Sequence, residues 1–153
     1  MKSTLKLTIL GAVAALALPL SAHAQWWSQH PGYLHAMSDL RSAYWLISHH
    51  ETMDPAANDE ERHAMGEIRA AYGELKQASI VDSKDIDDQP PADFRFEDHS
   101  GRLHHAMDLL QKAHNDIASE EDNPAARDLR NRSTRHIDEA GRWTAAAMHA
   151  WRF

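Results

Sequence analysis

Apolar residues recur at steps of three and four positions in four stretches of the chain, over residues 31–50, 58–80, 97–119 and 123–151. This spacing matches the turn of an amphipathic α-helix that buries one face. The apolar stripes comprise, in chain order, Tyr33, Met37, Leu40, Tyr44, Ile47, Ala64, Ile68, Ala71, Tyr72, Leu75, Leu103, Met107, Leu110, Ile117, Leu129, Ile137, Ala140, Ala147 and Trp151. We therefore expect an all-α protein whose four helices share one core.

Helix-start signals and one long connection separate these segments. Asn58 with Glu61 three residues later has the pattern of a capping box, and Asn123 followed by a proline favours a helix start. Residues 81–94 contain several aspartates and the pair Pro90-Pro91, a composition that argues against helix and favours a solvated crossover. The residue spacing of a calcium-binding loop is absent there. Short, long and short connections predict an up-down-up-down four-helix bundle.

The first 24 residues have the pattern of a cleavable signal peptide. Lys2 and Lys6 precede an apolar run over residues 7–20, and Ala22-His23-Ala24 has the small-x-small form of a cleavage site. We expect residues 25–153 to form a single helical domain in the periplasm or outside the cell. No later stretch is apolar enough to span a membrane.

Composition excludes several classes of function. Removing the two signal-peptide lysines changes the net charge from −7 to −9, and an acidic chain does not favour nucleic acid. The chain has no cysteine, which excludes thiolate metal sites, covalent haem attachment and thiol catalysis. Metalloprotease, nucleophile-elbow and P-loop motifs are also absent. We therefore expect a protein that is not an enzyme.

The first two helical segments each contain one copy of an internal repeat. Residues 35–44 read HAMSDLRSAY and residues 63–72 read HAMGEIRAAY, while residues 105–114 carry a degraded copy, HAMDLLQKAH. The methionine, aliphatic residue, alanine and tyrosine of the first two copies fall on the apolar stripe, and histidine replaces the tyrosine in the third. The acid and the arginine flank that stripe, where they can pair along or between helices. The repeat is thus consistent with duplicated packing, and it also places an acid one turn after a histidine.

Histidine is the clear compositional bias, because 11 of the 12 histidines lie after the signal peptide. Neutral imidazole binds copper, zinc and nickel, and a nearby carboxylate can orient the ring. If the first and third helices start at the same end, one half of the bundle gathers His30, His35, His104 and His136. A second set near the other end comprises His63, Glu67 and His114. These sets predict a non-enzymatic buffer or carrier of a transition metal.

Two other functions fit the same sequence. The outline resembles the soluble periplasmic b-type cytochromes, which hold haem between a methionine on the first helix and a histidine on the fourth. Met37 and His149 have analogous positions, but the helical phase of His149 points it away from the core, which argues against haem. A metal-free periplasmic interaction or stress-response module is the main alternative, and an exposed apolar concavity would favour it. The sequence does not define the oligomeric state or a protein partner.

Overall fold

Four helices and no strand make up the part of the chain that the computed structural model describes, residues 32–49, 58–95, 99–119 and 123–150. They are α1 (Gly32–Ser48), α2 (Asp59–Val81), α3 (His99–Ala118) and α4 (Arg127–Ala150). The all-α prediction is confirmed for these residues. The predicted signal peptide (1–24), His30 and Trp151 lie outside them. None of the described helices is both long and apolar enough to cross a membrane.

The helix starts follow the predicted capping residues at α2 and depart from them at α4. At α2 the capping box is complete, since the Glu61 amide donates to Asn58 Oδ1 at 2.8 Å and the Asn58 amide donates to Glu61 Oε2 at 3.1 Å. Asn123 instead holds a turn before α4, because its side-chain oxygen accepts from the Ala125 amide at 3.0 Å. The fourth helix therefore begins later than its cap signal suggests.

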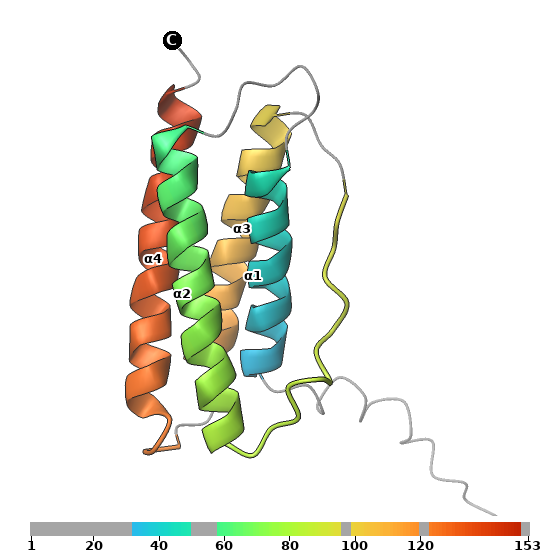
Figure 1. Ribbon diagram of the computed structural model, residues 1–153, viewed down its shortest axis with the longest axis vertical. Coiled ribbons are helices and arrows are strands. Elements are labelled where there is room, and N and C mark those ends of the chain that lie inside the picture. Colours follow the sequence, from blue (N-terminus) through green and yellow to red (C-terminus); the bar gives the residue numbers. More distant parts are fainter. Residues whose placement is uncertain (1–31, 50–57, 96–98, 120–122, 151–153) are drawn as a thin grey trace, which may run out of the picture.

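The helix directions correct the predicted up-down-up-down topology. Arg102 in the first turns of α3 contacts Leu46 at the end of α1, and Ser79 at the end of α2 contacts Met37 near the start of α1. Both α2 and α3 are thus antiparallel to α1, and they are parallel to each other, so the order is up-down-down-up (Figure 1). The prediction is wrong because it assumed that consecutive helices reverse direction.

The connection between α2 and α3 makes this topology possible. Its described part, residues 82–95, runs along the outside of the bundle from the end of α2 toward the opposite end (Figure 1). Its 17 residues, 82–98, can extend over about 56 Å at about 3.3 Å each, whereas the 23 residues of α2 rise only about 35 Å. The predicted crossover is therefore long enough to return the chain to the end where α2 began.

The four helices form a ring in the order α1, α2, α4, α3, with every neighbouring pair antiparallel. The pairs α1/α4 and α2/α3 lie on the diagonals. The predicted stripes form the core, and most of their described members are fully buried. Tyr44, Tyr72, Met107 and Leu129 are only partly buried. Three of these four side chains border grooves on the bundle surface.

Candidate functional site

An open groove of about 540 Å³ lies between α1 and α2 and is bounded on one side by the α2–α3 connection. Its lining is mainly apolar and aromatic, and comprises Leu40, Arg41, Tyr44, Trp45, Ser48, His49, Ile68, Arg69, Tyr72 and Phe94. A concavity of this size and composition is typical of sites that bind small organic ligands.

The internal repeat builds the floor of this groove from both helices. The first copy contributes Leu40, Arg41 and Tyr44, and the second contributes the equivalent Ile68, Arg69 and Tyr72. Because α1 and α2 are antiparallel, the two copies are related by an approximate twofold rotation through the groove. The guanidinium carbon of Arg69 lies 5.8 Å from the centre of the Tyr44 ring, which is within the range of a cation–π contact.

The acidic residue of each repeat copy faces away from the groove, toward a different neighbouring helix. Asp39 of the first copy binds Lys112 on α3, with a Nζ–Oδ2 distance of 2.6 Å. Glu67 of the second copy binds His136 on α4, with an Oε2–Nδ1 distance of 2.6 Å. In each of these two copies, the acid therefore lies at a contact with another helix, whereas the arginine lines the α1–α2 groove. Neither arginine pairs with the acid of its own copy.

The environments of two acids give pKa shifts of opposite sign. Burial raises the pKa of Asp39 above its usual value, and the hydrogen bond from Lys112 offsets this only in part. At the α2–α4 contact, the hydrogen bond from Arg132 lowers the pKa of Glu74. Asp39 is thus held at an energetic cost when ionised, whereas Glu74 is stabilised as a carboxylate.

An aromatic wall closes the end of the groove near the start of α2. The Trp45 ring stacks on His49 with centroids 4.5 Å apart and meets the Phe94 ring of the connection at 5.5 Å. The connection is fixed there by a hydrogen bond from the Asp93 amide to Ser42 Oγ at 2.8 Å. Phe94 is nevertheless 46% exposed, so the wall leaves apolar ring surface in contact with solvent.

Positive groups dominate the polar part of the groove, although the whole chain has a net charge of −7. Among the described residues, its lining includes two arginines, Arg41 and Arg69, and no carboxylate. The neighbouring carboxylate of Asp93 accepts a 2.7 Å hydrogen bond from Arg95, which lowers the Asp93 pKa and satisfies that charge locally. The groove is therefore an electropositive, aromatic depression on an acidic protein.

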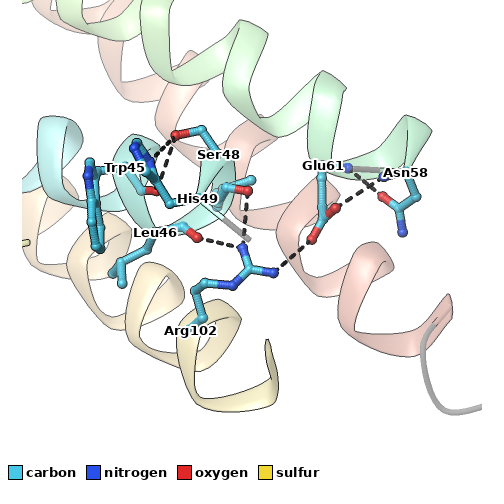
Figure 2. A network of polar contacts seen from close by, with 8 residues as sticks. Trp45, Leu46, Ser48, His49, Asn58, Glu61 and Arg102 are labelled. Carbon is cyan, nitrogen blue, oxygen red and sulfur yellow. Dashed lines mark hydrogen bonds and ion pairs between the residues drawn. The ribbon is translucent and has the colours of Figure 1, made fainter. Parts of the chain in front are cut away.

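A serine and a histidine lie side by side at the end of α1, but both serve the helix terminus. The Ser48 hydroxyl donates to the Trp45 carbonyl oxygen at 3.1 Å, and His49 Nδ1 lies 3.0 Å from the same oxygen (Figure 2). The same oxygen accepts a backbone hydrogen bond from the His49 amide at 2.9 Å, so these side chains add to a hydrogen bond that already closes the helix end. Ser48 Oγ also lies 3.0 Å from His49 Nδ1, and both atoms contact the Trp45 carbonyl oxygen.

The first predicted histidine set is not brought together in the structure. His35 lies in the first turn of α1, whereas His104 is exposed near the start of α3, and antiparallel packing puts these turns at opposite ends of the bundle. His136 lies on α4 and contacts Glu67. His30 lies outside the described residues. The grouping depended on α1 and α3 starting at the same end, and that assumption is wrong.

The second predicted set is also divided among different contacts. His63 stacks on Trp143 of α4 with centroids 4.6 Å apart, and His114 Nδ1 lies 2.9 Å from Asp138 Oδ1. Glu67 meets His136, a member of the first set. His63 and His114 lie on diagonally opposed helices. Across the described ranges, no group of three histidine, aspartate or glutamate side chains is arranged to hold a metal ion.

The two residues of the cytochrome resemblance lie toward opposite ends of the bundle. Met37 is buried near the start of α1, and its sulfur accepts a hydrogen bond from Ser79 at 3.8 Å. His149 is exposed in the last turn of α4, which runs parallel to α1. The predicted outward orientation of His149 is confirmed.

A buried ion pair lies near the groove, and it was not predicted from the sequence. Arg102 donates to the carbonyl oxygens of Leu46 at 2.5 Å and Ile47 at 3.1 Å, and its Nη2 lies 3.7 Å from Glu61 Oε1 (Figure 2). Both charged side chains are almost fully buried. Arg102 thereby joins the end of α1 to the first turn of α2 and fixes the helix end that bears Trp45. Its position beside Leu103 on the apolar stripe is the sequence signal that could have revealed it.

No protein-family model matches the chain, and no curated protein or solved structure matches it significantly.

Proposed function

We propose that the protein is an exported, non-enzymatic binding module that holds an apolar or aromatic group in the α1–α2 groove. The observation that supports this proposal is the open groove itself, in which two repeat copies and the crossover connection gather four aromatic side chains around one concavity. Such a concavity is the feature that favours the metal-free interaction module over the other functions that fit the sequence.

The physical basis of binding is partial burial. Tyr44, Trp45 and Tyr72 are only partly covered by their neighbours, and Phe94 is more exposed than they are. A ligand that covers these rings removes apolar surface from water, which contributes about 25 cal/mol for each Å² covered. The rings are held by helix packing and by the hydrogen bonds of the connection, so binding requires little additional ordering. The groove therefore has both the apolar surface and the rigidity that a binding site requires.

Titration with the neutral fluorescent compound N-phenyl-1-naphthylamine tests this function. We expect saturable binding that Phe94→Ala weakens several-fold, because that substitution removes part of the aromatic wall. Val81→Ala is the matched control, since Val81 is 44% exposed, close to the 46% of Phe94, but does not line the groove. Absence of saturable binding, or equal weakening by both substitutions, would contradict the proposal.

Transition-metal binding is a second candidate function. Its support is the contact between His136 Nδ1 and Glu67, because a carboxylate bound to one ring nitrogen can orient the other toward copper, zinc or nickel. The His114–Asp138 contact has the same form on the α3–α4 side. The described residues supply pairs rather than a three-ligand set, so this candidate has less structural support than the groove.

A further inference from the structure

We propose that the ligand of the α1–α2 groove is an amphipathic anion, in which a carboxylate or sulfonate is attached to an aromatic or aliphatic body. Arg41 and Arg69 would bind the acid group, while the aromatic wall would cover the body. This inference rests on the proposed binding function and adds the chemical class of the ligand.

The first argument is that the groove arginines are not used in ion pairs. Within the described ranges, neither Arg41 nor Arg69 forms an ion pair, although the chain is rich in carboxylates. The nearest acids of the repeat are bound elsewhere, Asp39 by Lys112 and Glu67 by His136. The two guanidinium groups therefore keep their capacity to bind an external anion.

The second argument comes from the degraded third copy of the repeat, which provides an internal comparison. Its equivalent residues Leu110, Gln111 and His114 line another groove of about 460 Å³ between α3 and α4. There a glutamine replaces the arginine and a histidine replaces the tyrosine. That groove also contains Asp138, which contacts His114. Equivalent positions thus line both grooves, but the pairing of arginine with tyrosine occurs only on the α1–α2 side.

The third argument is the chemistry of the arginine side chain. A guanidinium group presents paired donors that match both oxygens of a carboxylate, and its face stacks on aromatic rings. The contact between Arg69 and the Tyr44 ring shows this stacking on one side of the groove. The approximate twofold relation places Arg41 in the equivalent position on the other helix. Both arginines line the groove, so we expect both to contribute to recognition of an anion.

The test compares two probes with the same aromatic body. N-phenyl-1-naphthylamine is neutral, and 8-anilino-1-naphthalenesulfonate carries an added sulfonate. We expect the intact chain to bind the anionic probe about tenfold more tightly than the neutral one, since charge-assisted hydrogen bonds are individually worth about that factor. Arg41→Gln and Arg69→Gln should each weaken binding of the anionic probe more than binding of the neutral probe, so that this preference falls several-fold. Glutamine is the residue that the third copy already has at this position.

Arg142→Gln is the matched control, because Arg142 lines the α3–α4 groove and pairs with Glu139 on its own helix. It should leave both affinities unchanged. All three arginines are exposed, and far-UV circular dichroism will establish that each variant is folded. Equal binding of the two probes, or an unchanged preference in both groove variants, would overturn the anion inference and leave the binding function standing. Failure of the intact chain to bind either probe would overturn both.

Discussion

Replacing the buried Arg102 with methionine should destabilise the bundle strongly. The substitution keeps an apolar stem of similar length but removes the donors to the Leu46 and Ile47 carbonyls at the end of α1 (Figure 2). It also leaves the carboxylate of Glu61, which is fully buried, without its cationic partner. Loss of one partner from a buried ion pair typically costs about 3–5 kcal/mol.

The remaining contacts of Glu61 place the expected loss near the lower end of that range. Glu61 Oε2 still accepts from the Asn58 amide, so the carboxylate stays partly satisfied. We therefore expect a loss of about 3 kcal/mol in the free energy of unfolding, a large fraction of the 5–15 kcal/mol typical of a domain. Urea unfolding followed by circular dichroism at 222 nm measures this loss directly.

A double variant separates the buried charge from the lost hydrogen bonds. Glu61→Gln removes the charge, and the amide oxygen can still accept from the Asn58 amide. We therefore expect Glu61→Gln/Arg102→Met to be about 1–2 kcal/mol more stable than Arg102→Met alone. Arg142→Met, at an exposed arginine, should change stability by less than about 0.5 kcal/mol. A loss below about 1 kcal/mol for Arg102→Met would refute the reasoning.

Other predictions concern pH, the core and metal. Burial raises the Asp39 pKa in the folded state, so its ionisation costs stability as pH rises above about 3.8; urea unfolding at several pH values should show Asp39→Asn flattening that decline. The lowered pKa of Glu74 has the opposite sign: it stabilises the fold above its unfolded value near 4.5, and Glu74→Gln should reduce the loss of stability on acidification. Leu75→Ala, at a fully buried position, should cost about 2–5 kcal/mol in the same assay. The metal candidate predicts saturable calorimetric binding of copper, zinc or nickel that His136→Ala weakens and that falls near pH 5; non-saturable binding insensitive to that substitution would remove this candidate.

Local structure follows closely from the sequence because its causes are local. Periodic apolar positions such as Ile68 and Leu75 set the buried face of α2, and Asn58 with Glu61 sets its start. These features depend on interactions within one or two turns of a helix. The helices and their buried stripes could therefore be predicted without knowledge of how the helices pack together.

Topology and the groove could not be predicted in the same way. The spacing of apolar residues does not determine whether a 17-residue connection returns along the bundle or joins adjacent helix ends. The predicted histidine sets depended on the helix directions that follow from this path. The helical phase of Tyr44 and Tyr72 places both on the stripe, but whether a neighbouring helix covers them is a property of the assembled bundle. The repeat was visible in the sequence, whereas its shared groove required the antiparallel pairing of α1 with α2.

The measurement that tests the binding groove most directly is a nuclear magnetic resonance titration of the isotope-labelled chain with 8-anilino-1-naphthalenesulfonate. The Trp45 indole N–H signal, together with the backbone amide signals of Tyr44 and Tyr72, should show the largest saturable shifts, because these residues line the α1–α2 groove. The amides of Gln111 and His114 in the α3–α4 groove should shift little. Largest shifts at Gln111 and His114, or shifts spread evenly over the four helices, would contradict the assignment of the α1–α2 groove as the ligand site.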